Sequence, residues 1–239
     1  MRFKSKNIMI VGASSGIGLD LLHLLISEGA TVYAVSRTSS DSWPVSVHYL
    51  EMDVCHFSES LFSFVPDKLD GLVYCVGNIN LKPFNRISEC DFLDDFRLNV
   101  VGAAQSVQHS LKSLKNSSSA SIVLISSVAA RTGMPYHAST AASKAAIEGL
   151  AISLAAEFSS NKIRVNAVSP SLTNTPLASK LVNTPEKIEA SNKRHPIGRI
   201  GSARDISAAI AYLLSEDSAW ITGQVIAVDG GLSKLKTSM

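Results

Sequence analysis

Ile8-Met9-Ile10-Val11 followed by Gly12-Ala13-Ser14-Ser15-Gly16-Ile17-Gly18 is the stretch that decides the fold. An apolar strand runs directly into a glycine-rich turn, and the turn opens a helix. Glycines let the backbone turn tightly and approach a pyrophosphate, and the exposed N–H groups of a helix start favour anions. A lone glycine cluster is more often just a turn, but here the strand before it and the helix after it supply the needed context. A Walker phosphate loop is excluded because no Gly-Lys-Ser/Thr follows.

The rest of the chain alternates short apolar runs with helical patterns, which predicts a Rossmann-type, doubly wound α/β fold with a parallel sheet of about seven strands and helices on both faces. The expected strands are residues 8–11, 31–35, 45–50, 72–76, 122–125, 165–168 and 225–228. The expected helices are residues 17–25, 92–114, 141–158 and 205–214. No linker or repeat divides the chain, so a single domain over residues 1–239 is expected. Residues 173–199 are poorly patterned and suit either a mobile cover over a site or a passive surface excursion.

Composition excludes several classes of function. Of the 239 residues, 46% are hydrophobic and 18% are charged, as in a globular protein with a large core. A net charge of +2 with scattered Lys and Arg gives no reason to expect nucleic acid or a membrane as a partner. The three cysteines fall in no metal-ligand spacing, so reduced thiols and no metal site are expected. No segment has the ~20 apolar residues of a membrane span, and the apolar stretch after the basic N-terminus is too short for a signal peptide, so we expect a cytoplasmic protein.

Further motifs are spread over essentially the whole chain. They are Asp53-Val54, Leu98-Asn99-Val100-Val101-Gly102, Ser127, Lys144, Arg164-Val165-Asn166-Ala167-Val168-Ser169-Pro170 with Thr175-Pro176, Gly198-Arg199-Ile200-Gly201, and Ile221-Thr222-Gly223-Gln224 with Val228-Asp229-Gly230-Gly231. Together with the Gly-x-x-x-Gly-x-Gly turn they resemble the short-chain dehydrogenase/reductase family. Each motif alone is modest, but their joint specificity is very high. The resemblance implies a small-molecule carbonyl or alcohol substrate and a homodimer or homotetramer built on helices 92–114 and 141–158.

The resemblance also implies which residues form the site. Residues expected to bind the cofactor are Gly12, Ser14, Ser15, Gly16, Ile17, Gly18, Ser36, Arg37, Asp53, Val54, Gly77, Asn99, Lys144, Pro170, Thr173 and Thr175. In the family a tyrosine protonates the carbonyl oxygen as hydride arrives, and a serine hydrogen-bonds that oxygen. A lysine lowers the tyrosine pKa and binds the ribose, and an asparagine supports a water-mediated proton path. Ser127, Lys144 and Asn99 match the serine, the lysine and the asparagine.

Three positions depart from the family pattern. Tyr74-Cys75-Val76-Gly77 replaces Asn-Asn-Ala-Gly, Ser171 replaces a glycine, and Thr140 replaces the catalytic tyrosine. The aliphatic hydroxyl of threonine is a far weaker acid than a phenol of pKa about 10, and its side chain is shorter. Loss of general acid catalysis typically costs about 10²–10⁴ in rate. His137 and Tyr136, in the loop entering the catalytic helix, are candidate replacement acids, and each can also be read as a wall or packing residue.

The second expected strand ends in Ala34-Val35-Ser36-Arg37, which bears on the choice of cofactor. An acidic residue at position 36 would accept the 2′-hydroxyl of the adenosine ribose and repel a 2′-phosphate. Ser36 does neither, and the guanidinium of Arg37 can hold a phosphate. We therefore expect NADP(H) in preference to NAD(H), although Arg37 can also be read as an ordinary solvent-exposed arginine.

Two functions from different classes follow. The first is an NADP(H)-dependent oxidoreductase that interconverts a ketone and a secondary alcohol with an altered proton donor. The alternative is a catalytically impaired NADP(H)-binding protein that acts in sensing or assembly. Retention of Ser127 and Lys144 favours the first, whereas Thr140 favours the second. A lyase- or isomerase-like reaction has no positive signature in the sequence.

Overall fold

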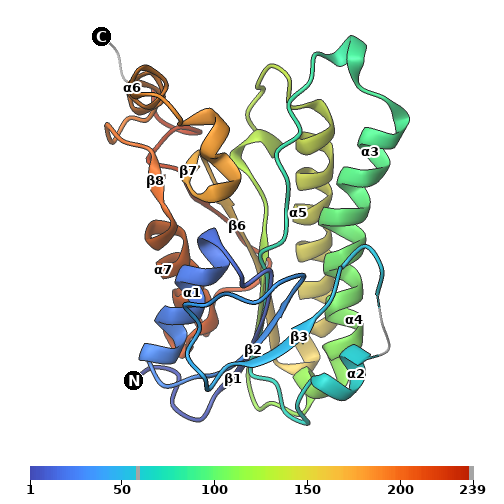
Figure 1. Cartoon of the computed structure of the whole chain (residues 1–239). Coiled ribbons are helices and arrows are strands. Elements are labelled where there is room, and N and C mark those ends of the chain that lie inside the picture. Colours follow the sequence, from blue (N-terminus) through green and yellow to red (C-terminus); the bar gives the residue numbers. More distant parts are fainter. Residues whose placement is uncertain (58–59, 237–239) are drawn as a thin grey trace.

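A computed structural model describes residues 1–57 and 60–236, which contain a seven-stranded parallel sheet in the order β3-β2-β1-β4-β5-β6-β9 (Figure 1). The strands are β1 (Asn7–Val11), β2 (Thr31–Ser36), β3 (His48–Glu51), β4 (Gly71–Tyr74), β5 (Ala120–Ile125), β6 (Ile163–Pro170) and β9 (Val225–Val228). A separate pair joins β7 (Thr173–Asn174) to β8 (Gly201–Ser202). The strand order reverses direction between β1 and β4, and this switch point is where ligands bind in open α/β sheets. The predicted doubly wound fold is confirmed.

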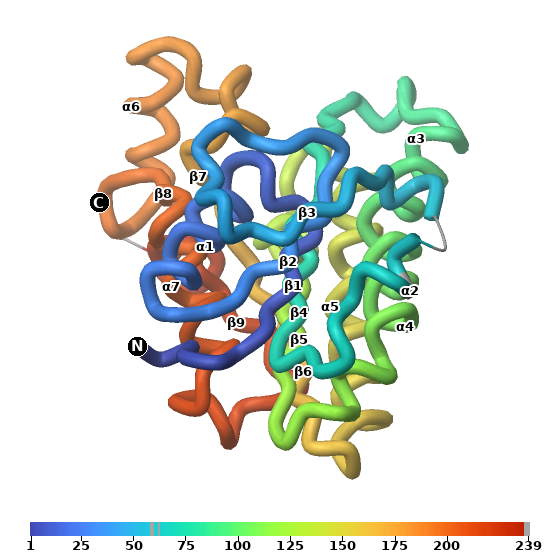
Figure 2. The backbone as a smooth tube through the Cα atoms, turned by 60° about the horizontal axis from the view of Figure 1, so that its bottom comes forward, coloured from blue at the N-terminus to red at the C-terminus, as the bar shows by residue number. Residues whose placement is uncertain are grey.

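Helices cover both faces of the sheet, as Figure 2 shows along the strands. One face carries α1 (Gly16–Ser27) and α7 (Ala203–Leu214); the other carries α2 (Ser60–Phe64), α4 (Gly102–Lys115) and α5 (Ala138–Phe158). The remaining α-helices are α3 (Glu89–Phe96) and α6 (Pro185–Arg194). Shorter 3₁₀ segments are Phe84–Arg86, Val128–Ala130, Ser159–Asn161, Pro176–Leu181 and Glu216–Ser218. None of the helices in the described part of the chain is long and apolar enough to cross a membrane.

The two faces form two hydrophobic cores because successive strand residues point to opposite sides. In β1, Met9 and Val11 pack in the core beneath α4 and α5, whereas Ile8 and Ile10 pack beneath α1 and α7. Both sets are at most 1% exposed. The central strands are therefore apolar throughout, which is the pattern that identified them in the sequence.

Several predicted boundaries are wrong. The strand expected at 45–50 begins only at His48, and Val45 is fully exposed. The strand expected at 72–76 ends at Tyr74, because the following residues leave the sheet. The helix expected at 92–114 is interrupted by a π-helical turn, Arg97–Val101, between α3 and α4. The poorly patterned residues 173–199 contain the helix α6, which was not predicted. Ser191 is the one buried residue of α6, so the helix has no apolar periodicity in its sequence.

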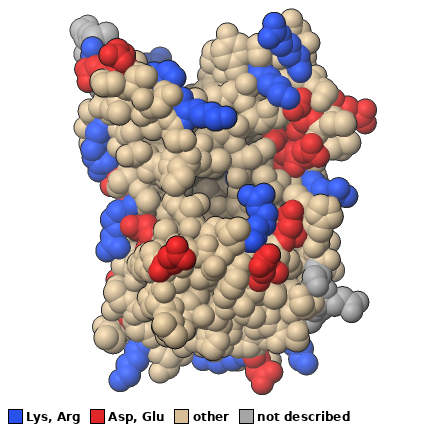
Figure 3. All heavy atoms as spheres, in the orientation of Figure 1, with Lys and Arg blue, Asp and Glu red and all other residues tan. Residues whose placement is uncertain are grey.

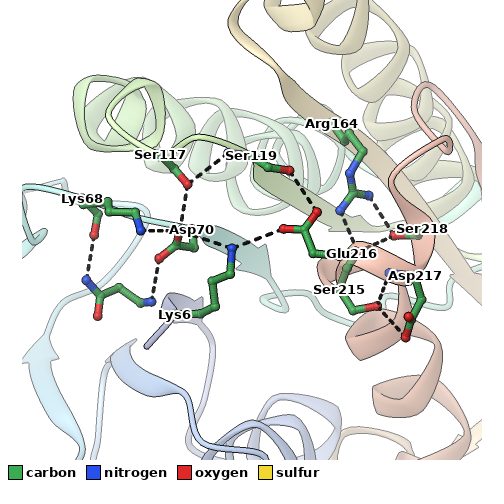
Figure 4. Close-up of polar contacts among 11 residues, drawn as sticks. Lys6, Lys68, Asp70, Ser117, Ser119, Arg164, Ser215, Glu216, Asp217 and Ser218 are labelled. Carbon is green, nitrogen blue, oxygen red and sulfur yellow. Dashed lines mark hydrogen bonds and ion pairs between the residues drawn. The ribbon is translucent and has the colours of Figure 1, made fainter. Parts of the chain in front are cut away.

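A polar network stabilises the amino ends of the strands (Figure 4). The buried carboxylate of Asp70 accepts hydrogen bonds from the Asn7 backbone N–H at 3.0 Å and from Ser117 Oγ at 2.8 Å, and it lies 3.1 Å from Lys68 Nζ. Arg164, on β6, is also buried and donates to the Leu213 and Ser215 carbonyls at 2.8 and 3.0 Å. Both charged groups are buried together with several hydrogen-bond partners, which offset the cost of their desolvation, although Arg164 Nε has no partner among the described residues.

Candidate active site

A cavity of about 330 Å³ opens at the carboxyl ends of the strands. Its walls come from the segments that follow β4, β5 and β6, from the start of α5, and from the 3₁₀ segment Pro176–Leu181. In Figure 3 this face of the molecule is hollowed between its two upper lobes, with mostly uncharged side chains inside and Lys or Arg at the rim. A concave, largely apolar site at the switch point is where a dinucleotide and a small substrate are expected to meet.

The glycine turn has the shape that a dinucleotide pyrophosphate needs. Gly12 has φ +92°, and a Cβ at Gly18 would lie 2.0 Å from the Gly12 carbonyl oxygen, so neither position accepts a side chain. Ser15 precedes α1 in an extended conformation without a side-chain cap, and the first turn contains no acidic residue. The N–H groups at the start of α1 are therefore open to an anion. The residues present fit the pyrophosphate of a nicotinamide dinucleotide, and Ile17 lines the adjoining cavity.

The end of β2 has one exposed cation. The buried Ser36 hydroxyl donates to the Thr38 carbonyl at 2.7 Å, so it presents no negative charge to a ligand. Arg37 is exposed and makes no hydrogen bond or ion pair that involves its guanidinium within residues 1–57 and 60–236. Asp53 accepts a hydrogen bond from the Cys55 N–H at 2.9 Å, and this bond holds the pKa of Asp53 below its usual range. Val54 packs into the core, so only its backbone is placed to meet an adenine ring.

Ser127 and Lys144, both expected to be catalytic, line the cavity with side chains that can donate a proton. Ser127 begins the 3₁₀ turn Val128–Ala130, where its Oγ accepts a hydrogen bond from the Ala129 N–H at 3.2 Å. That bond uses an oxygen lone pair, so the Ser127 hydroxyl proton is left to donate to a substrate. Lys144 lies one turn along α5 from Thr140 and donates from Nζ to the Ile125 carbonyl at 2.8 Å. Burial lowers the pKa of Lys144 to about 8, against the opposing influence of Cys75 and Asp95.

Thr140 lines the same cavity, but its hydroxyl proton has a structural partner. The side chain is 6% exposed, and Oγ1 donates to the Asn80 carbonyl at 3.3 Å. A carbonyl oxygen can only accept, so the direction of this bond is settled. Thr140 therefore ties the start of α5 to the loop after β4 and has no second proton to give.

The structure separates the two candidate replacement acids. Tyr136 has φ +69° and is 60% exposed, and it lines a shallower pocket beside Arg131 rather than the cavity around Lys144. His137 lines both pockets, and its Nδ1 donates to the Pro135 carbonyl at 2.6 Å. His137 is thus brought to the cavity and Tyr136 is not.

The other expected cofactor residues lie along the cavity or its approach. Gly77, Pro170, Thr173 and Thr175 all line it. Asn99 is completely buried on the π-helical turn, and its Nδ2 donates to the Asp95 carbonyl at 2.8 Å. A Cβ at Gly77 would lie 3.3 Å from both Asn99 Oδ1 and Lys144 Nζ, so these two polar atoms converge on the space beside Gly77.

Two hydrogen-bonded pairs of polar residues in or behind the cavity wall were not predicted from the sequence. Ser171 Oγ and His195 Nε2 lie 2.9 Å apart in the cavity wall, and His195 Nδ1 donates to the Ser191 carbonyl at 2.7 Å. Asn78 lines the cavity and donates to the buried carboxylate of Asp95 behind it. His195 was not predicted because it lies in a segment without a clear sequence pattern. Asp95 was not predicted because it belongs to an acid-rich stretch, which is typical of an exposed surface. No group of three or more His, Cys, Asp or Glu side chains in the described residues could hold a metal ion.

Comparison with known proteins gives consistent matches over nearly the full length. A family model described as enoyl-(acyl carrier protein) reductase matches residues 12–233. A tropinone reductase homolog of Arabidopsis thaliana is 33% identical, with 95% of this chain and 92% of that protein covered. The 3-oxoacyl-(acyl carrier protein) reductase FabG of Thermotoga maritima is also 33% identical, with 97% and 99% covered.

Solved structures agree. The ligand-free aldohexose dehydrogenase of Thermoplasma acidophilum has a TM-score of 0.89 at 27% identity, covering 99% of this chain and 98% of the other. The structure of ElxO with NADP bound has a TM-score of 0.88 at 26% identity, covering 96% and 99%.

Proposed function

This chain belongs to the short-chain dehydrogenase/reductase family of NAD(P)-dependent oxidoreductases, and from that premise we propose that it is an NADP(H)-dependent enzyme interconverting a ketone and a secondary alcohol. The observation that carries the proposal is the convergence of the Ser127 hydroxyl, the Lys144 ammonium and the Gly77 backbone on one cavity beside the glycine turn. When bound, the nicotinamide supplies or accepts the hydride.

Each proposed role follows from what the side chain can donate. Ser127 has a free hydroxyl proton with which to polarise a carbonyl oxygen, in the manner of an oxyanion-hole donor. Lys144 and Asn99 present polar atoms beside Gly77, where they would hold the ribose and support proton movement. We propose Gly12, Ser14, Ser15, Gly16, Ile17 and Gly18 for the pyrophosphate, Asp53 and Val54 for the adenine, and Pro170, Thr173 and Thr175 for the nicotinamide.

Preference for NADP(H) rests on Arg37. Its guanidinium is exposed beside Ser36, which bears no charge that would repel a 2′-phosphate. In calorimetric titrations we expect NADPH to bind more tightly than NADH. Arg37→Ala should weaken NADPH about tenfold, the low end for an exposed charge-assisted contact, and leave NADH unchanged. Equal affinities in the wild type, or an unchanged NADPH affinity in the variant, would refute the preference.

One observation favours the alternative, a catalytically impaired NADP(H)-binding protein. The hydroxyl at the tyrosine position is committed to the Asn80 carbonyl, so the usual donor is absent. A panel of small ketones assayed by NADPH oxidation distinguishes the two functions. Turnover that depends on Ser127 supports the reductase, whereas tight NADPH binding without turnover on any carbonyl supports the binding protein.

We also propose assembly as a homodimer or homotetramer, with the protein in the cytoplasm. Support for the assembly comes from exposed apolar side chains on α3 and α5, where Phe96 is 45% and Ile152 is 51% exposed. Light scattering after size-exclusion chromatography tests it. Ile152→Glu should reduce the measured mass, and a monomeric wild type would contradict the proposal.

A further inference from the structure

A carboxylate is buried directly behind the cavity wall. Asp95, near the end of α3, is 1% exposed. One carboxylate oxygen accepts a hydrogen bond from Asn78, and the other has no hydrogen-bond partner among the described residues. A carboxylate buried with an open oxygen is costly unless a nearby cation compensates its charge.

The buried carboxylate is connected to the cavity through two amides. Asn78 lies in the cavity wall and donates to Asp95, while its own Oδ1 accepts from Asn99 Nδ2 at 3.2 Å. Asn99 lies on the π-helical turn, a local distortion that frequently marks functional sites. Its Oδ1 also lacks a partner among the described residues and faces the space beside Gly77.

Asn78 and Asn99 form a bridge of two amides between Asp95 and the cavity, and Lys144 is the cation at the cavity end of this bridge. Its Nζ faces the same space beside Gly77, and only one of its three N–H bonds has a partner within the described chain, the Ile125 carbonyl. Burial has the largest effect on the pKa of Lys144 and lowers it, whereas Cys75 and the negative charge of Asp95 act in the opposite direction. Lys144 and Thr140 both line the cavity, so no phenol at position 140 stands between Lys144 and a substrate.

We propose that Lys144 gives the substrate oxygen the proton that a phenol would otherwise give, and that Asp95 keeps Lys144 charged across the Asn78–Asn99 bridge. Lys144 is then a catalytic residue, and Asp95 a positioning residue that acts through it. The inference deepens the reductase function proposed above and rests on it.

The proton and electron balance is complete. The carbonyl carbon takes up hydride from the reduced nicotinamide, the π electrons of the C=O bond move to oxygen, and oxygen takes a proton from Nζ. An O–H bond forms as an N–H bond of Lys144 breaks. The products are the alcohol, the oxidised nicotinamide and a neutral amine, which a proton from solvent recharges. A donor whose pKa lies near the working pH is well suited to this step.

Few other titratable groups surround Lys144. Asp95 on α3 and Cys75 after β4 are the acidic groups that act on it, and burial raises the pKa of Cys75 to about 12, so this thiol is neutral. His137, Arg194 and His195 line the same cavity, and none of them carries a negative charge. Asp95 is therefore the charge whose removal should be felt at Lys144.

A lysine NMR titration of the cofactor-free protein tests the coupling without catalysis. The ε-methylene signal of Lys144, identified by its loss in Lys144→Met, should titrate near pH 8 in the wild type. Asp95→Asn and the non-polar Asp95→Val should each lower this pKa by about one pH unit, because an opposite charge has been removed. Asp91→Asn is the matched control, since Asp91 lies one turn earlier on α3 and binds the same loop through Asn80, and it should leave the titration unchanged.

Turnover supplies the second readout. As pH rises, Lys144 loses its proton, so kcat for ketone reduction should fall above about pH 8. This fall is the alkaline limb of the pH profile. In Asp95→Asn the alkaline limb should move to lower pH by the same amount as the NMR titration, whereas a purely structural defect would lower kcat at every pH. Lys144→Arg cannot release a proton near neutrality and should lose about 10²-fold or more in kcat while still binding NADPH.

The outcomes separate the two proposals. An unshifted Lys144 titration in both Asp95 variants, or full turnover in Lys144→Arg, overturns the inference. A large loss of kcat in His137→Ala with an unmoved alkaline limb assigns the proton to His137 and also overturns it. A wild type that binds NADPH but reduces no ketone at any pH overturns the reductase function and the donor role with it, while the titration still decides whether Asp95 and Lys144 are coupled.

Discussion

Replacing Thr140 by valine should cost stability but not catalysis. Valine keeps the branched shape of threonine and removes the hydroxyl. The lost hydrogen bond to the Asn80 carbonyl is long, at 3.3 Å, so we place its contribution at the low end of about 0.5–1.5 kcal/mol. In a chain of this size such a loss lowers Tm by about 1–4 °C. Because the hydroxyl proton is committed to that carbonyl, kcat for ketone reduction should change by less than about threefold, far below the effect of removing a general acid.

Thermal unfolding and steady-state NADPH oxidation measure the two effects on the same samples. Ser127→Ala is the matched comparison, because it also removes one hydroxyl from the cavity wall, but one whose proton is free. It should lose about 10²-fold in kcat, as expected for an oxyanion-type donor. Its Tm should also fall by a few degrees, because Ser127 Oγ accepts the Ala129 N–H. If Thr140→Val loses as much activity as Ser127→Ala while its Tm stays at the wild-type value, the hydroxyl of Thr140 donates to the substrate and our reading of its hydrogen bond is wrong.

Two further predictions concern the glycine turn and the base of the sheet. Gly18→Ala places a methyl group 2.0 Å from the Gly12 carbonyl; the backbone must shift, so we expect NADPH affinity to fall at least about tenfold and stability by roughly 2 kcal/mol. Gly149→Ala on α5, where a Cβ meets nothing within 4 Å, is the control and should preserve both in calorimetry. Arg164→Met removes buried hydrogen bonds to the Leu213 carbonyl and its neighbours, so Tm should fall by roughly 6–12 °C while NADPH binding is unchanged. A Tm within about 2 °C of wild type would show that the network adds little.

The regular parts of this protein could be predicted because their physical causes are local. Apolar strands buried on both faces, and glycines at a turn where a side chain would clash, leave clear marks in the sequence. The helix now divided into α3 and α4 could not be resolved, because a π-helical turn inserts no distinctive residue. α6 was missed since it buries almost nothing.

The sequence could predict which residues of the candidate site have reactive side chains, but not which atoms those side chains contact. Ser127, Asn99 and Lys144 stood out by their motifs, and the structure places all three around one cavity or its wall. The role of Thr140 depended on which atom its hydroxyl faces, which the sequence does not contain. Asp95 is one of several acidic residues in a short stretch, and only the course of the backbone shows that it points inward while Asp94 is exposed.

The buried charged network and the candidate active site lie at opposite ends of the same strands. Asp70 and Arg164 secure the amino ends, whereas the carboxyl ends carry Thr140 and the loop it binds. Because different side chains hold the two ends, a substitution at the carboxyl ends need not weaken the amino ends. Protein engineers could therefore vary positions at the carboxyl ends of the strands, such as Thr140 and Ser171, while keeping the amino ends unchanged.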